Sequence, residues 1–275
     1  MYLFLKDLVL HEASAHQHWL GIGLPSPTAI VGLAENISFF ISKKLGVNIK
    51  LTIAPIIYKC DLCNYRSPFR SYMPKDPHMK KIRITVNPQS YIELDLVIKI
   101  EGCSTDEFKA ISTSQIVLGF LNRLRLAKSP IVPKEECQII PDIAYSENEL
   151  YQLIFNRPCH GFFIKECTEV LNNYKDEKND TLDALIAALD NFKQSEDFEN
   201  NQFIPVSLGY HLLEKPRYRK GARELLNHAY AEPLFGLVQC KYLFDMSITQ
   251  LDSVFWSYVW QTENYICTTQ HERLR

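Results

Sequence analysis

The sequence predicts an α+β fold in which helices pack against a sheet. Strand, helix and strand patterns follow one another over residues 3–57, and a further strand and helix pattern occupies residues 91–127. Polar and apolar residues alternate over 91–100, as in a strand with one buried face. With 275 residues, 46% of them hydrophobic, the chain is long enough to bury a sizeable core. This order of elements is that of a split βαβ unit and predicts a ferredoxin-like core.

The first helix is expected at residues 26–45, between strands at 3–10 and 47–57. Ser26 is a preferred N-cap residue, and Pro27 suits the first helical turn. Apolar residues recur at helical spacing and fall on one face: Ile30, Leu33, Ile37, Phe40 and Ile41. These features together predict a long amphipathic helix.

A loop rich in Pro, Tyr and Arg is expected at residues 59–81. Strands are expected to follow at 82–86 and 91–100, and the turn-forming residues 87–90 predict a hairpin between them.

The second long helix is expected at residues 106–127, with Ser104 or Thr105 as its cap. Its apolar residues are spaced for burial: Phe108, Ile111, Ile116, Phe120 and Leu124.

The second half of the chain is less regular. A short strand is expected at 161–165, an amphipathic helix at 181–192, and strands at 203–213 and 234–244. A last helix is expected to carry four apolar residues: Leu251, Phe255, Trp256 and Val259.

We expect two parts, a ferredoxin-like core at residues 1–141 and a C-terminal α/β portion at residues 142–275 that packs on this core. Residues 169–199 contain nine Asp or Glu and three Lys, and predict an acidic helical segment within the second part.

Composition disfavours several classes of protein. No uncharged apolar run is long enough for a membrane span, and the apolar start is interrupted by Lys6 and Asp7, so we expect a cytoplasmic protein. The eight cysteines are scattered, which favours free thiols. Cys60 and Cys63 have metal-ligand spacing, but only Cys103 or His78 is available to complete a zinc site, and we predict no metal. The glycine-rich phosphate and dinucleotide motifs are missing, so we expect no cofactor.

The most informative charge feature is the segment 215–223, Lys-Pro-Arg-Tyr-Arg-Lys-Gly-Ala-Arg. It holds five cationic residues and no acid, whereas the whole chain has a formal net charge of -2. Pro216 and Gly221 predict a turn. Arg is the preferred partner of phosphate because its planar fork of donors matches two phosphate oxygens. The turn is either a solvated surface loop or a phosphate-binding site.

Further cationic groups have aromatic or polar neighbours, a pattern typical of single-stranded RNA recognition. A second group of cations lies at the end of the predicted helix 106–127 and includes Arg123 and Arg125, where it also complements the helix dipole. A basic loop with interleaved aromatic residues contains the candidate DNA-binding residues Arg66, Arg70, Lys75, Lys80, Lys81 and Arg83.

Catalysis is an alternative that we weigh lower. The candidates for general acid or base are His16 and His18 near the first strand, and Tyr210 and His211 before the basic turn. Side chains of these types can transfer protons in general acid–base catalysis. A third alternative is an interaction protein whose basic turn binds an acidic partner.

Several stretches of the chain, in order, resemble a known family. Gly21-Ile-Gly-Leu-Pro-Ser-Pro-Thr-Ala-Ile-Val-Gly-Leu33 is similar to its Gly-x-Pro-Ser-x-Thr-Ala-x-x-Gly motif, and Pro205-Val-Ser-Leu-Gly-Tyr-His-Leu-Leu-Glu214 to its Gly-Tyr-His-Leu-Leu-Glu segment. Lys220-Gly-Ala-Arg, His228-Ala-Tyr-Ala-Glu-Pro-Leu-Phe-Gly-Leu237 and Val254-Phe-Trp-Ser257 follow in the family's order. The family is the Cas-five-type (Csy two) subunit of type I-F CRISPR surveillance (Cascade) complexes.

This resemblance implies an RRM-like core of the RAMP type and a non-catalytic role. Some similar subunits cut repeat RNA, so the enzymatic alternative is a metal-independent endoribonuclease that uses the histidine and tyrosine candidates named above. Such subunits bind the 5′ handle of the guide CRISPR RNA, cap the backbone of Cas-seven-type subunits, and bind a large subunit that reads the protospacer-adjacent motif. A scaffold role is implied for Gly23, Pro25, Ser26, Thr28 and Gly32. Charge and position make the following the candidate RNA-binding residues, together with Arg123 and Arg125: His211, Arg217, Arg219, Lys220 and Arg223.

An alternative within the family concerns minimal systems that lack a large subunit. There the Cas-five-type subunit itself would recognise the motif in target double-stranded DNA, and the basic loop at 59–83 would approach the duplex.

Overall fold

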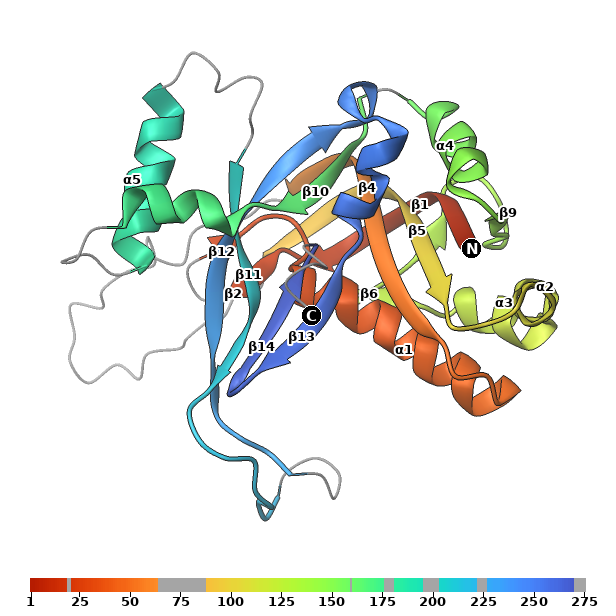
Figure 1. Ribbon diagram of the computed structural model, residues 1–275, viewed down its shortest axis with the longest axis horizontal. Coiled ribbons are helices and arrows are strands. Elements are labelled where there is room, and N and C mark those ends of the chain that lie inside the picture. The colour runs from red at the N-terminus through yellow and green to blue at the C-terminus, as the bar shows by residue number, and fades with distance from the viewer. Residues whose placement is uncertain are drawn as a thin grey trace, which may run out of the picture.

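The computed structural model describes residues 1–18, 21–63, 88–158, 160–175, 181–194, 203–221 and 227–269. Within this part of the chain, a large antiparallel sheet runs through the molecule and helices lie on both of its sides (Figure 1). The sequence prediction is thereby confirmed at the level of a mixed fold with a large antiparallel sheet and several helices. No described helix is long and apolar enough to cross a membrane.

The large sheet contains ten strands in the described residues: β1 (Tyr2–Ser14), β4 (Lys50–Cys63), β5 (Gln89–Glu101), β8 (Val132–Pro133), β9 (Asp142–Ala144), β10 (Phe162–Glu166), β11 (Phe203–Leu212), β12 (Ala231–Tyr242), β13 (Ser257–Gln261) and β14 (Asn264–Thr268). Their order is β13-β14-β11-β12-β10-β4-β5-β1-β8, and β9 also pairs with β1. Two short pairs lie apart from this sheet: β2 (His16–His18) with β3 (Gly21–Ile22), and β6 (Arg125–Leu126) with β7 (Ser129–Pro130).

The described helices are α1 (Pro27–Leu45), α2 (Thr105–Thr113), α3 (Gln115–Leu121), α4 (Glu147–Phe155) and α5 (Thr181–Gln194), with 3-10 segments η2 (Thr168–Tyr174), η4 (Leu243–Asp245) and η5 (Ile248–Val254). Helix α1 begins as predicted, since the Ser26 hydroxyl accepts a hydrogen bond from the Ala29 N–H at 3.3 Å. It ends at Gly46, whose left-handed φ of 71° lets its N–H donate to the Ser42 carbonyl.

Two hydrophobic cores lie on opposite faces of the central strands. Because side chains alternate along a strand, Leu3 and Leu5 of β1 join the core that contains α1, α2 and α3. Tyr2 and Phe4 join the core that contains α4 and η5. Figure 1 shows α1 below the strands and α4 above them. Burying one such aliphatic or aromatic side chain contributes roughly 1.5–3 kcal/mol.

The C-terminal segment returns to the first half of the chain at Trp256. This residue is fully buried and forms an isolated bridge with Ile53 of β4, with backbone N···O distances of 2.8 and 3.1 Å. The Trp256 indole N–H donates to the Ile164 carbonyl at 2.9 Å. This bridge holds β13 close to β4, and β14 lies next to α1 (Figure 1).

Two predicted helices were wrong. The helix expected at 106–127 is two short helices, because Ser114 adopts an extended conformation and its hydroxyl caps α3 through the Val117 N–H. The helix expected around Leu251 to Val259 is η5 followed by β13, since Trp256 is drawn into the sheet by its bridge to Ile53. Helix α4 had no sequence prediction.

The predicted strand at 82–86 lies outside the described residues. Gln89 and Ser90, expected in a hairpin turn, already belong to β5 and pair with Cys63 and Leu62 of β4. Of the acidic segment at 169–199, the described portions form η2 and α5. Strands from both expected parts join the one large sheet, and the division at residue 141 stays a prediction.

Candidate nucleic-acid interface

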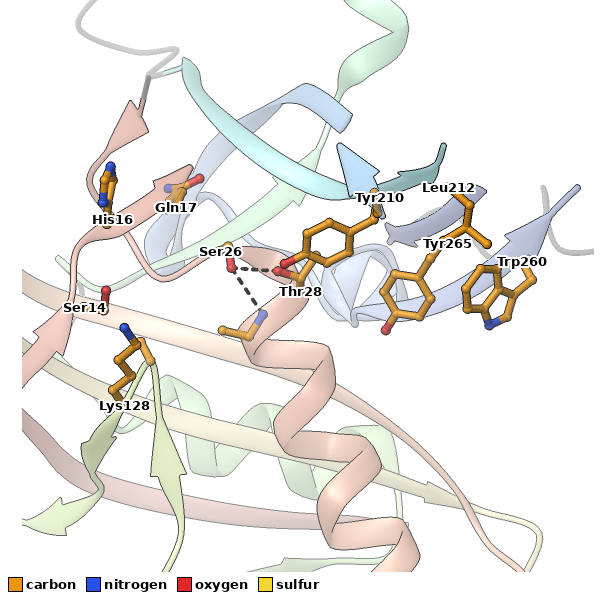
Figure 2. A pocket seen from close by; sticks show the side chains of 13 residues that line it. Ser14, His16, Gln17, Ser26, Thr28, Lys128, Tyr210, Leu212, Trp260 and Tyr265 are labelled. Carbon is orange, nitrogen blue, oxygen red and sulfur yellow. Dashed lines mark hydrogen bonds between the residues drawn. The ribbon is translucent and has the colours of Figure 1, made fainter. Parts of the chain in front are cut away.

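A hollow of about 640 Å³ opens at the start of α1 (Figure 2). We call it the α1 groove. Its lining comes from segments far apart in sequence: Ser14, His16, Gln17, Ser26, Thr28, Ala29, Ala127, Lys128, Tyr210, Leu212, Ala231, Trp260 and Tyr265. The groove therefore depends on the assembled fold and not on any one motif.

The floor of the α1 groove is the first turn of α1. The Ser26 hydroxyl lies 2.8 Å from the Thr28 hydroxyl, and this turn contains no acidic residue. Gln17 ties the floor to the sheet, because its side-chain amide donates to the Leu24 carbonyl at 2.7 Å and accepts from the Ser207 N–H at 3.0 Å. The positive end of a helix dipole at this floor favours an anionic ligand.

One wall of the groove is aromatic. Tyr210 of β11 is paired in register with Tyr265 of β14, which is paired in turn with Trp260 of β13. The rings of Trp260 and Tyr265 meet edge to face, with centroids 5.3 Å apart. Trp260 is 56% exposed and Tyr210 is 43% exposed. Rings this exposed offer faces on which unpaired bases can stack.

The opposite side of the groove carries Lys128 (Figure 2). Lys128 and Ala127 have positive φ angles of 73° and 48° in the tight turn between β6 and β7. Arg125 stabilises this turn, since its guanidinium Nε and Nη2 donate to the Lys128 carbonyl at 3.1 and 2.7 Å. Arg125 and Lys128 also line a neighbouring hollow of about 200 Å³. The structure thus places these two cations together, although on a β turn and not at a helix end.

Arg123 is exposed, but it does not line the α1 groove. Its Nε donates to the Gly119 carbonyl at 3.1 Å, at the end of α3.

The basic turn is the end of a long arm formed by β11 and β12, which projects from the body of the protein (Figure 1). Leu213 N–H donates to the Tyr230 carbonyl at 2.9 Å, and Arg217 and His228 exchange two backbone hydrogen bonds. Lys215 and Lys220 are exposed on this arm and form no ion pair within the described part of the chain. Arg223 lies outside the described residues.

Glu214 holds the two arginines of the turn. Its Oε2 lies 3.1 Å from Arg217 Nη2, and its Oε1 accepts from Arg219 Nη2 and from the Tyr230 N–H. The Arg219 guanidinium also lies over the Tyr230 ring, 4.4 Å from its centroid. These contacts lower the pKa of Glu214, first through the Tyr230 N–H and then through Arg219 and Arg217.

The four catalytic candidates do not all line the same site. His16 and Tyr210 line the α1 groove, whereas His211 does not and its Nδ1 lies 2.7 Å from the Asn264 side-chain oxygen. The backbone of His18 belongs to β2, but its side chain lies outside the described part. The six candidate DNA-binding residues of the basic loop, 66, 70, 75, 80, 81 and 83, also lie outside the described residues.

Within the described ranges, no three His, Cys, Asp or Glu side chains come together as a metal site. Cys60 is half-buried and Cys63 is exposed at the end of β4, and both are free thiols. His78, the other residue considered with them, lies outside the described residues.

Sequence reasoning missed two residues of the groove, Trp260 and Tyr265. The apolar spacing around Val259 predicts a helix, so no pair of strands was expected beside β11. The aromatic and β-branched residues of Tyr258-Val-Trp260 and Tyr265-Ile266 are a strand signal in the sequence.

The comparison with known protein families gave one finding. The profile of a family described as CRISPR-associated protein (Cas_Csy2) matches residues 3–267, which is nearly the whole chain. No curated protein sequence matched.

Proposed function

Because the chain belongs to the CRISPR-associated Csy2 family of type I-F Cascade subunits, we propose that it is a non-catalytic subunit that binds the 5′ handle of the guide RNA. In this proposal the handle enters the α1 groove. The arm formed by the ends of β11 and β12 and the basic turn between them, which we call the basic arm, contacts the phosphates of the handle. The protein also caps the backbone of Cas-seven-type subunits and, where one is present, contacts a large subunit.

The observation that carries the proposal is the meeting of exposed rings, a lysine and an acid-free helix start in one groove. Unpaired RNA is bound by aromatic stacking on its bases together with cationic contacts to its phosphates. Tyr210 and Trp260 supply rings, and Lys128 supplies a charge on the other side. The volume of about 640 Å³ is that of a small-ligand site and suits unpaired nucleotides better than a duplex.

The strand order also supports a ferredoxin-like, RRM-like core of the RAMP type. The segment β4-β5-β1-β9 places the second, third, first and fourth strands of the expected unit side by side and antiparallel. Helix α1 connects β1 with β4, and α2 and α3 follow β5. We infer this core from these pairings, and the cytoplasmic location stays a prediction.

Tryptophan fluorescence tests the groove directly. The purified protein would be titrated with single-stranded RNA that carries the 5′ handle of its own CRISPR array, and with the same RNA lacking the handle. We expect the handle RNA to quench the emission of Trp260, and Trp260→Phe to remove most of this quenching. Trp256 serves as an internal reference because it is fully buried.

Matched variants separate the groove from the rest of the surface. Tyr210→Ala is expected to weaken binding of the handle RNA about tenfold or more, since one stacked base contributes about 1–3 kcal/mol. Lys128→Ala is expected to weaken it as well, because a cationic contact to a phosphate is lost. Phe155→Ala, at an exposed ring on α4, and Lys44→Ala, at the opposite end of α1, are the controls. Equal binding by all four variants would show that the groove does not take RNA.

A ribonuclease function is the second candidate, because His16 and Tyr210 line the same groove. Incubating the protein with precursor repeat RNA in EDTA decides between the two, since a metal-independent nuclease would cut under these conditions. We expect no cleavage. Cleavage by the wild-type protein that His16→Ala abolishes would replace the non-catalytic proposal.

Recognition of the protospacer-adjacent motif in target double-stranded DNA is the alternative for a system without a large subunit. It rests on the basic loop, and on no residue of the α1 groove. A gel-shift assay of the assembled complex with DNA that carries or lacks the motif, with and without charge reversal at Arg66 and Arg70, tests it.

A further inference from the structure

The basic arm contains an interrupted strand ladder. Leu213 pairs with Tyr230 and Arg217 pairs with His228, so three residues on one side face a single residue on the other. Pro216 lies in this interruption and has no N–H to donate. Because the ladder is interrupted here, the Tyr230 N–H has no backbone acceptor among the described residues, and the Glu214 carboxylate accepts its hydrogen bond at 3.0 Å.

The same carboxylate oxygen also binds Arg219. The Arg219 side chain is only 27% exposed, it stacks on the Tyr230 ring, and its Nε is buried without a hydrogen-bond partner. Leaving this place would break the charged contact and the ring contact together. Arg219 is thus enclosed within the arm.

Arg217 is held differently. Its backbone is fixed by two hydrogen bonds to His228, but its side chain is 67% exposed, and among the described residues its one ion pair is to the other oxygen of Glu214, at 3.1 Å. An exposed ion pair of this kind is weak and exchanges readily. A phosphate oxygen can replace the carboxylate at Arg217 without any movement of the arm.

We propose that Glu214 divides the arginines of the arm into two roles: with Tyr230 it fixes Arg219 as a permanent brace, and it presents Arg217 as the arginine that transfers to an RNA phosphate. The inference deepens the proposed function and rests on it. Arg219, selected from the sequence as an RNA contact, is then a positioning residue. The phosphate contacts of the described arm come from Arg217 and its exposed neighbours Lys215 and Lys220.

Two readouts on the full-length protein test this division. Amide hydrogen exchange at Tyr230, without RNA, reports on the brace. Binding of a fluorescein-labelled RNA with the 5′ handle, measured at several salt concentrations, reports on phosphate contacts, because each contact that is lost lowers the slope of log K against log salt by about 0.7.

We expect Arg217→Ala to lower this slope by about 0.7 and to leave exchange at Tyr230 unchanged, and Arg217→Lys to restore the slope because phosphate needs only the charge. Glu214→Gln and Arg219→Ala are expected to speed exchange at Tyr230 and to keep the slope. Arg219→Lys should not rescue the brace, since only a planar guanidinium can stack on the Tyr230 ring while it donates hydrogen bonds to the Glu214 carboxylate. Glu232→Gln, an exposed acid on the same arm, is the charge control.

The proposal is overturned if Arg219→Ala lowers the salt slope while exchange at Tyr230 is unchanged, or if Arg217→Ala opens the arm. If the wild-type protein binds no RNA at all, the proposed function and the role of Arg217 both fail. Exchange at Tyr230 would still decide the brace in that case, so the two failures can be told apart.

Discussion

Arg157 donates to the buried carboxylate of Asp95 through Nε, at 2.7 Å, and through Nη2, at 3.3 Å. Asp95 is fully buried and also accepts from the Tyr58 hydroxyl and from the Asp7 N–H, both at 2.7 Å. Asp7 lies where β1 bulges against β5 and has a positive φ of 54°. One carboxylate thus joins the bulge of β1, strand β4 and the residue Arg157 that follows α4.

Replacing Asp95 with Ala is expected to cost about 3 kcal/mol of the free energy of unfolding, because the Tyr58 hydroxyl, the Asp7 N–H and the Arg157 guanidinium lose a buried acceptor, although Arg157 keeps its ion pair with the Asp7 carboxylate. Urea unfolding followed by far-UV circular dichroism measures this as a lower midpoint at an unchanged slope. Lys134→Ala, which breaks the exposed pair with Glu93, is the control and should move the midpoint little. Equal midpoints for the two variants would contradict a structural role for Asp95.

A methyl group at Gly209 is expected to separate β11 from β14. A Cβ at this position would collide with the Tyr265 carbonyl, and backbone cannot move aside as a flexible side chain can. Gly209→Ala should therefore lower the melting temperature and abolish the quenching of Trp260 by RNA.

Gly32→Ala is the matched control for that change. Gly32 is in α1, where an added Cβ meets nothing within 4 Å. Because Ala favours a helix over Gly by about 1 kcal/mol, this variant should melt slightly higher and bind RNA as the wild type does. A fall in melting temperature of the same size for both variants would show that close approach at Gly209 is not the cause.

We expect the reactivity of each cysteine thiol to depend on its burial. Burial raises the pKa of Cys167, Cys240 and Cys267 to about 12, so they are almost entirely protonated at pH 8 and unreactive. Iodoacetamide on the folded protein should label Cys63 and Cys137, which are exposed, and spare the three buried thiols. Peptide mass spectrometry measures the labelled sites, with urea-unfolded protein as the positive control. Early labelling of Cys240 would mean that β12 opens in the native state.

The brace of the arm should depend on pH in a defined direction. The pKa of Glu214 is lowered by the Tyr230 N–H, Arg219 and Arg217. The stability that its carboxylate gives to the brace is therefore fully present above the ordinary pKa of 4.5, and it is lost as the pH falls through the lower pKa of the folded protein. Protection of the Tyr230 amide, corrected for intrinsic exchange, should hold at pH 6 and decline below pH 4. Glu214→Gln should show no such decline, and a similar decline in that variant would assign it to another group.

Local rules predicted α1 well, because Ser26, Pro27 and the apolar stripe all act within one helix. They failed at residues 106–127, where Ser114 acts as a second N-cap inside an apolar pattern that continues across it. They failed again near Trp256, because its position is set by a bridge to Ile53, about two hundred residues away. The sequence likewise pointed to the basic arm but not to the brace, since the partner of Arg219 depends on how the ladder is interrupted.

The α1 groove can form only late in the synthesis of the protein. Its floor comes from residues 14–29 and its aromatic wall from residues 210–265, so the ribosome must release the chain through residue 265 before both sides exist. A nascent or truncated chain has the floor without the wall. Under the proposed function, translation products that stop before residue 265 would not compete for the guide.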